Sequence, residues 1–125
     1  MGKRFIVCGG RKFDDAEAVH KALDRLHAKV GIDEIAEGGA PGADRHARKW
    51  AKARGIPVRT FPADWDKYGH HPGSKAGPIR NAEMLAQFKP DGVVAFPGGV
   101  GTISMMAIAR MAKVMVWEPI VKGEK

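Results

Sequence analysis

Three pairs of adjacent glycines are the residues of this sequence best suited to bind a ligand: Gly9-Gly10, Gly38-Gly39 and Gly98-Gly99. Each pair follows a short run typical of a strand, and a predicted helix begins directly or shortly after it. Glycine lets the backbone approach a ligand closely, and the first turn of a helix offers unbonded N–H groups to an anion. Such turns can also require glycine for their geometry alone. Three of them in one fold favour a phosphate-bearing ligand.

Four polar side chains lie either directly after a glycine pair or in the first turn of a predicted helix. Arg11 and Lys12 directly follow the first glycine pair, where they could reach a phosphate or remain solvated loop charges. Arg80 and Asn81 fall in the first turn of a predicted helix. A cation in that position opposes the helix dipole, so an arginine there favours contact with an anion.

Each of the other candidate residues has a purely structural interpretation as well. Trp65, in a long segment without periodicity, could stack on a base or anchor the loop. Asp44 could act as an acid or cap the helix that begins beside the second glycine pair. His70-His71 has no partner at metal-ligand spacing, and Cys8 ends an apolar run, so neither predicts a metal site or a reactive thiol. We expect no cofactor and no metal.

Five short runs predict strands, at residues 5–8, 32–36, 57–61, 92–96 and 114–117. The helices predicted between them are one of about four turns that stops at Gly31, one over about 43–54, one that begins at Pro78 and one that reaches about Ala112. Residues 62–77 remain a loop. This alternation predicts an α/β fold: a single Rossmann-like, doubly wound domain with about five parallel strands and helices on both faces. Ligands of such folds bind at the carboxyl ends of the strands.

Length and composition narrow the class of protein. With 125 residues, we expect one domain over residues 1–125, with a loose tail at 119–125. One cysteine excludes a disulfide framework within the chain, and no apolar run approaches the roughly 20 residues of a membrane span, so we expect a cytoplasmic protein. The formal net charge is +7, and residues 38–89 hold ten Lys and Arg against four acids. This excess fits a phosphate pocket and leaves nucleic acid open as a partner.

The turn PGGVGT (97–102) resembles the PGGxGT signature of the SLOG superfamily, which groups the LOG phosphoribohydrolases with the DNA-processing protein DprA. The whole chain is most similar to the small YspA/YpsA-like SLOG proteins. GGAPGAD (38–44), PADW (62–65) and AGPIRN (76–81) carry this likeness in the expected order. The resemblance implies a Rossmann-like domain that binds a nucleotide or a nucleotide-derived ligand, such as a nucleoside monophosphate or an ADP-ribose-like molecule.

One position departs from the LOG pattern. LOG enzymes hydrolyse the N-glycosidic bond of a nucleoside 5′-monophosphate with the motif PGGxGTxxE, whose Glu is essential together with a distant Arg. Arg80 matches that Arg by resemblance, with Asn81 in place of the family's Lys, but Met105 stands where the Glu would be. Methionine cannot take a proton or stabilise a developing positive charge. Hydrolysis by the usual carboxylate is therefore not expected, and Asp44 is the first substitute.

The predicted functional residues fall into three groups. The tentative catalytic pair is Asp44 and Arg80. The predicted ligand-binding residues are Gly9, Gly10, Arg11, Gly38, Gly39, Gly42, Asp44, Trp65, Arg80, Asn81, Pro97, Gly98, Gly99, Gly101 and Thr102. The last predicted helix is apolar nearly all round, which predicts an oligomer interface, in keeping with dimers among LOG relatives, through Met105, Met106, Ile108 and Met111.

Three functions of different classes remain open. The preferred prediction is a module that binds or senses a nucleotide-like ligand without robust catalysis. The first alternative is an N-glycosidic hydrolase that uses Asp44 or another acid. The second is a DprA-like protein that binds single-stranded nucleic acid, against which the absence of RRM, KH and helix-turn-helix patterns weighs.

Overall fold

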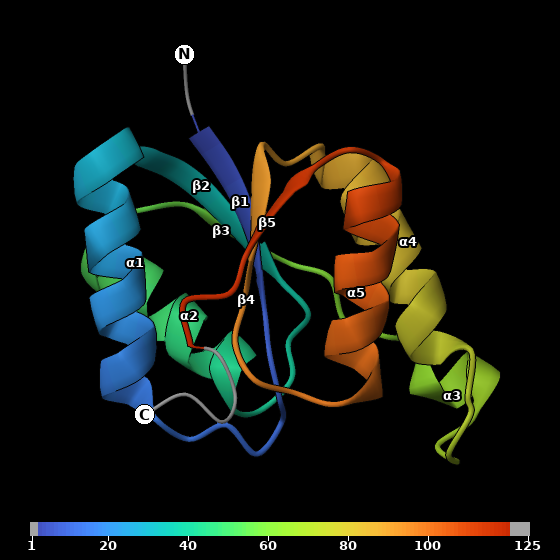
Figure 1. Ribbon diagram of the computed structural model, residues 1–125. Helices are drawn as coiled ribbons and strands as arrows, with labels where there is room; N and C mark the ends of the chain where they lie inside the picture. Colours follow the sequence, from blue (N-terminus) through green and yellow to red (C-terminus); the bar gives the residue numbers. More distant parts are fainter. Residues whose placement is uncertain (1–2, 121–125) are drawn as a thin grey trace.

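The computed structural model describes residues 3–120 and contains one parallel β-sheet with helices on both faces (Figure 1). Its strands are β1 (Lys3–Cys8), β2 (Ile32–Glu37), β3 (Val58–Thr60), β4 (Gly92–Ala95) and β5 (Met115–Trp117). They lie in the order β3-β2-β1-β4-β5. This order, which reverses its direction beside β1, is that of a Rossmann-like, doubly wound sheet. The predicted fold class is confirmed.

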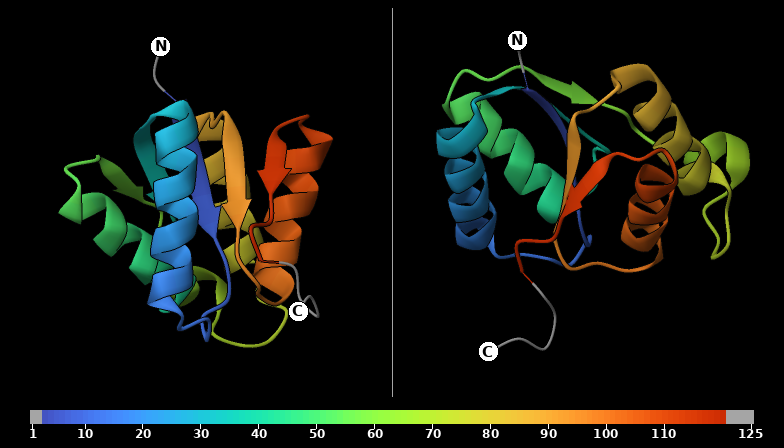
Figure 2. Two further views of the ribbon diagram at one scale, coloured as in Figure 1. Left: turned by 60° about the vertical axis from the view of Figure 1, so that its left-hand side comes forward. Right: turned by 45° about the horizontal axis from the view of Figure 1, so that its top comes forward.

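Two pairs of helices cover the sheet. α1 (Ala16–Val30) and α2 (Ala43–Ala53) pack on one face, and α4 (Ala76–Phe88) and α5 (Val100–Met111) pack on the other (Figure 2). The short α3 (Trp65–Tyr68) lies against α4. Within residues 3–120, no helix is both long enough and apolar enough to cross a membrane.

The two faces of β1 explain why its last four residues are apolar without interruption. Phe5 and Val7 belong to the core under α1 and α2, whereas Ile6 and Cys8 belong to the core under α4 and α5. Successive side chains of a strand point to opposite faces. A strand covered on both sides must therefore be apolar at every position, which is the pattern of a buried parallel sheet.

The pairing of β1 with β4 places the ends of these two strands at the same level. Cys8 is the register partner of Ala95, so the turns that follow them start side by side. The chain then continues into α1 on one face and into α5 on the other. The crevice between two such diverging turns is where doubly wound folds bind their ligands.

The observed helices differ from the predicted ones in two places. α4 begins at Ala76, two residues before Pro78, because the missing N–H of a proline is tolerated throughout the first helical turn. The predicted loop over 62–77 contains α3. This short helix is capped by Asp64, whose Oδ1 accepts a hydrogen bond from the N–H of Lys67 (3.0 Å).

The C-terminal segment differs from its prediction as well. The sequence predicts a loose tail at 119–125, but Ile120 is partly buried and packs against the core under α1 and α2. Apolar burial at this residue offsets the conformational entropy lost when the chain is ordered. The remaining residues of that prediction, 121–125, lie outside the described residues.

Candidate functional site

Three turns rich in glycine meet at the carboxyl edge of the sheet. In the turn after β1, the N–H of Gly10 donates to the carbonyl oxygen of Pro97, in the turn after β4 (2.9 Å). The carbonyl oxygen of Gly10 accepts from the N–H of Ala43, at the start of α2 (3.2 Å). The backbone of a single residue, Gly10, therefore connects all three turns.

Gly42 makes the approach of the second turn to the first possible. Its φ of +79° lies in the region that favours glycine. A Cβ atom on Gly42 would lie 2.6 Å from the carbonyl oxygen of Arg11, and closer still to that of Gly10. The second turn thus needs a glycine both for its dihedral angle and for its distance to the first turn.

The three turns and the first turns of α4 and α5 surround a cavity of about 840 Å³. This volume lies within the range of small-molecule sites, about 300–1,000 Å³. Most of the predicted binding residues line it: Gly9, Gly10, Arg11, Gly38, Asp44, Trp65, Arg80, Asn81, Pro97, Gly98, Gly99, Gly101 and Thr102. Gly39 and Gly42 do not line it, since Gly42 lies behind the first turn and the N–H of Gly39 donates to Glu37 Oε1 (2.7 Å).

The first turn of α5 forms an open side of this cavity. Its N-cap is Gly99, which has no side chain to cap the helix, and Gly98 and Gly101 are exposed beside it. Unbonded N–H groups and the positive end of the helix dipole attract an anion to such a position. Arg11 and Lys12, exposed on the turn after β1, add positive charge to the same cavity.

Arg80 lies between the second glycine turn and the loop after β3. Its Nη1 donates to the carbonyl oxygens of Gly38 (2.8 Å) and Phe61 (3.3 Å), and its Nε donates to Asn81 Oδ1 (2.9 Å). Asn81 Nδ2 in turn donates to the carbonyl oxygen of Gly101, in α5 (3.1 Å). Burial lowers the pKa of Arg80, although the charge of a neighbouring carboxylate opposes this, and a guanidinium stays charged in proteins. Its Nη2 has no hydrogen-bond partner among the described residues.

Asp44 lies on the other side of Gly38. Its Oδ2 accepts from the N–H groups of Gly38 (3.1 Å) and Ala40 (3.2 Å), so Asp44 supports the second turn and does not cap α2, whose N-cap is Gly42. Burial raises the pKa of this carboxyl to about 6, although the two N–H groups and Arg80 lower it. Asp44 lines the cavity, and its Oδ1 has no hydrogen-bond partner within the described part of the chain. A carboxyl with this pKa can give or take a proton near neutral pH.

The buried Asp44 carboxyl predicts a pH-dependent stability. The ordinary pKa of this group is 3.8, so its ionisation costs folding free energy as the pH rises from about 4 through about 6. We compare the wild type with Asp44→Asn, whose amide oxygen still accepts both N–H groups. Relative to this variant, the wild type is expected to gain about 1–1.5 kcal/mol of unfolding free energy between about pH 7.5 and about pH 5. Urea titrations of both proteins measure this, and a difference independent of pH would contradict it.

Glu37, at the end of β2, is not among the predicted residues, yet its side chain holds the second glycine turn in place. Its side chain is fully buried, and its Oε1 accepts from the N–H of Gly39 and from Arg48 Nη1 (3.4 Å). The hydroxyl of Thr60 donates to Oε2. A carboxylate at the end of a buried strand is the signal that could have found it, because a buried charge requires partners.

Apolar side chains outside the predicted ligand-binding set also form part of the cavity wall. The rings of Phe13 and Phe96 stack with their centroids 5.6 Å apart. Met84, Ile103 and Met106 line the cavity with them. A cavity lined both by hydrogen-bonding turns and by apolar side chains suits a ligand that is itself half polar and half apolar.

Trp65 anchors its loop against α4, and its stacking on a base stays a prediction. It lines the cavity, and its ring lies 4.0 Å from the position of a Cβ on Gly77, in the first turn of α4. It therefore anchors the loop and offers its ring to the cavity. His70 and His71 are exposed, and within residues 3–120 no three His, Cys, Asp or Glu side chains lie close enough together to hold a metal ion.

Cys8 and Met105 bear on catalysis in different ways. Cys8 lines the cavity, but burial, helped by the charge of Asp44, raises the pKa of its thiol to about 12. A thiol with this pKa is not a nucleophile at neutral pH. Met105 is fully buried in the core under α4 and α5 and does not line the cavity. A carboxylate at position 105 would lie in apolar surroundings in this conformation, which disfavours its charged form.

The outer face of α5 carries the apolar side chains that an oligomer interface would use. The large apolar side chains exposed there and in β5 are Val100 (85%), Ile103 (59%), Met111 (83%) and Met115 (61%). Of the residues predicted for the interface, Met105 lies in the core, and Met106 and Ile108 are partly buried. The predicted oligomer stays a prediction, and Met111 is the residue of the original set that is largely exposed.

Comparison with known sequences points to one family. Residues 3–68 match the family model YAcAr, described as the YspA, cpYpsA-related SLOG family. The chain is also 36% identical over 122 residues to the Gene 61 protein of Mycobacterium phage D29. That alignment covers 91% of this chain and 94% of the phage protein.

Two solved structures align with this chain at low identity. Glycinamide ribonucleotide transformylase 1 from Geobacillus kaustophilus aligns with a TM-score of 0.47 and 15% identity, over 93% of this chain and 56% of its own. Phosphoribosylglycinamide formyltransferase from Coxiella burnetii aligns with a TM-score of 0.42 and 11% identity, over 76% of this chain and 41% of its own. The chain spans about half the length of these two proteins, and similarity at this level carries no argument about function.

Proposed function

Because this chain belongs to the YspA, cpYpsA-related SLOG family, we propose that it binds a nucleotide or a nucleotide-derived phosphate ligand in the cavity at the carboxyl edge of the sheet. The ligand is a nucleoside monophosphate or an ADP-ribose-like molecule, and the protein acts as a cytoplasmic binding or sensing module. The observation that carries this proposal is a single cavity that holds both the uncapped first turn of α5 and the guanidinium of Arg80.

The lining of the cavity suits both halves of a nucleotide. A phosphate fits the first turn of α5, where N–H groups are free, with Arg80 and the charges of Arg11 and Lys12 in the same cavity. A base fits against accessible apolar side chains of the same cavity, those of Phe13, Trp65 and Ile103. This arrangement accounts for the excess of basic residues without requiring nucleic acid as the partner.

Native mass spectrometry and thermal unfolding test the proposal together. We expect the purified protein to carry a co-purifying nucleotide-like mass, and to form a dimer or a larger assembly through the outer face of α5. A ligand at 100 times its Kd stabilises the folded protein by about 2.7 kcal/mol, so the correct nucleotide raises the Tm. The proposal would be contradicted if no bound mass were found and if neither nucleoside monophosphates nor ADP-ribose raised the Tm. A strongly salt-dependent complex with single-stranded DNA would favour the nucleic-acid alternative instead.

N-glycosidic hydrolysis is a second candidate function, and Asp44 is the observation that favours it. This carboxyl lines the cavity with a pKa near 6, a value suited to a general acid or base. In such a reaction the bond between C1′ and the base would break as a water oxygen bonded to C1′, Asp44 would protonate the leaving base, and Arg80 would hold the phosphate. Analysis of the same nucleotides for free base separates the two functions. Base release by the wild type that Asp44→Asn abolishes would establish the hydrolase. If the wild type released no base, the result would favour the binding module.

A further inference from the structure

The chain after β5 forms part of the cavity wall. Glu118 and Ile120 both line the cavity. From β5, at the edge of the sheet, the segment runs toward the side of α1 and α2 (Figure 1), where Ile120 packs against the core. Trp117, directly before Glu118, is the register partner of Val94, so Glu118 begins at the level of Ala95 and of Cys8, where β4 and β1 end.

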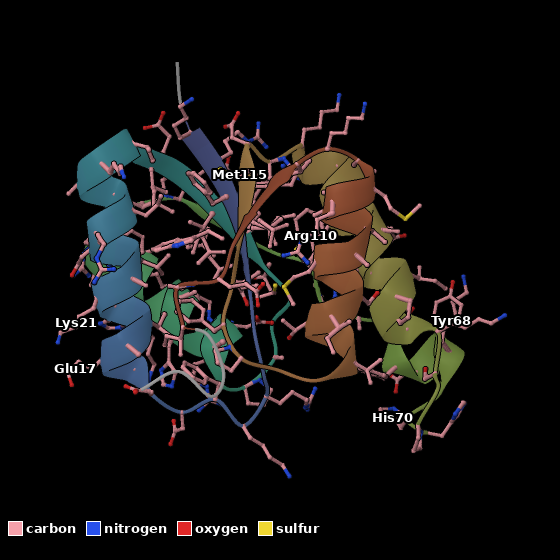
Figure 3. All side chains as sticks on the ribbon, in the orientation of Figure 1. Glu17, Lys21, Tyr68, His70, Arg110 and Met115 are labelled. Atoms are coloured by element: carbon pink, nitrogen blue, oxygen red, sulfur yellow. The ribbon has the colours of Figure 1, made fainter. Side chains whose placement is uncertain are left out.

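Glu118 is held from one side only. Its Oε2 accepts from Arg110 Nη2 (3.2 Å), in the last turn of α5. Arg110 extends from α5 toward the last strand, where this segment begins (Figure 3). The other carboxylate oxygen, Oε1, makes no hydrogen bond to any residue in the described part of the chain. One acceptor of a cavity-lining carboxylate is therefore available to a ligand.

The charges of the cavity decide which part of a ligand this acceptor can meet. A phosphate is repelled by a carboxylate and attracted to the first turn of α5. Glu118 directly follows β5, whose Trp117 is the register partner of Val94, so this acid lies at the same carboxyl edge of the sheet as the first turn of α5. A phosphate held by that turn and the carboxylate of Glu118 therefore face the same cavity, where the carboxylate is not a partner for the phosphate. An uncharged group that donates a hydrogen bond suits the carboxylate.

We propose that Glu118 is a specificity-determining residue that accepts a hydrogen bond from the nucleoside half of the ligand, with Arg110 as its positioning residue. This inference rests on the proposed function. The donor is a neutral N–H or O–H group, and a nucleotide offers three sources of it: a ribose hydroxyl, an amino group of the base, and the ring N–H of guanine, hypoxanthine or uracil. Glu118 accordingly selects ligands that present such a donor on their nucleoside half.

Binding measurements with matched nucleotides test this role. The probes are AMP, GMP, CMP, UMP and IMP with their 2′-deoxy counterparts, titrated by calorimetry into the wild type and variants. IMP differs from GMP only by the missing amino group, whereas AMP and CMP carry an amino group where IMP and UMP carry a carbonyl beside a ring N–H. The deoxy compounds lack one ribose hydroxyl. We expect Glu118→Ala to weaken the tightest wild-type ligand by about 10- to 100-fold, the range for hydrogen bonds to charged groups. Glu118→Ala should then bind this ligand and the matched ligand without the donor with equal affinity.

Three further variants make the result decisive. Glu118→Gln keeps an oxygen acceptor and should lose less affinity than Glu118→Ala. Arg110→Ala should give an intermediate loss with the same preference among ligands. Glu17→Ala, an exposed acid of α1 that does not line the cavity, should change nothing. Equal weakening of all probes by Glu118→Ala, or no weakening, would overturn the role of Glu118 while the proposed function stands. If the wild type bound no probe, the proposed function would fail and this inference with it.

Discussion

Replacing Arg80 by methionine is expected to weaken nucleotide binding by about 10- to 100-fold, because a hydrogen bond between a guanidinium and a phosphate is lost. Arg80 lines the cavity and keeps one terminal nitrogen free of hydrogen bonds to the described residues. Methionine fills a similar volume without the charge. Calorimetric titration with the nucleoside monophosphate that stabilises the wild type most gives the affinity.

The same substitution is expected to act on Asp44. The charge of Arg80 lowers the pKa of this carboxyl, so Arg80→Met should raise the pKa of Asp44 above about 6. Arg80→Lys keeps the charge but not the planar fork of donors, and its affinity should fall between those of the wild type and Arg80→Met. Arg45→Ala, an exposed cation of α2 outside the cavity, is the matched control and should bind as the wild type does. Equal affinities for Arg80→Met and Arg45→Ala would rule out the contact.

Gly42→Ala is expected to cost about 3 kcal/mol of unfolding free energy, which corresponds to a fall in Tm of roughly 10 °C for a chain of this size. Gly42 combines φ of +79° with ψ of −130°, a region open to glycine and costly for any other residue. An added Cβ also meets the backbone of Arg11 at 2.6 Å, and backbone gives way less easily than a side chain. Urea and thermal unfolding measure the loss.

Gly55→Ala separates the two causes of this effect. Gly55 also has a positive φ, +69°, but a Cβ there would meet nothing within 4 Å. Its replacement should therefore cost only the dihedral penalty of about 1 kcal/mol. The remainder of the Gly42→Ala effect measures the contact between the first two turns together with the higher cost of the ψ angle of Gly42. If both variants lost the same stability, the close approach of these turns would contribute nothing.

The sheet could be predicted from the sequence because its burial leaves a plain pattern. A strand covered on both faces is apolar at consecutive positions, as Phe5 to Cys8 are. The first residues of the helices were harder to predict from the sequence. Pro78 marks a first turn but not its first residue, and α3 is a single turn that depends on one capping carboxylate, Asp64.

Most of the cavity lining could also be predicted, since every glycine pair lies directly after or near the end of a strand. Parallel strands bring their carboxyl ends to one edge, so the turns had to meet. Two acidic residues that support or line the cavity could not be placed in this way. Glu37 lies within a strand, and Glu118 lies far along the chain from every glycine turn.

The sequence by itself determined the fold class, the family and the edge of the sheet where the site lies, because strand periodicity and glycine turns are local properties of the chain. Only the tertiary structure decided the chemistry of that site. The pKa of Asp44, the carbonyl partners of Arg80 and the presence of Glu118 in the cavity wall all depend on burial and on contacts between distant segments. Desolvation and charge pairing act through space, so the order of residues along the chain does not reveal them.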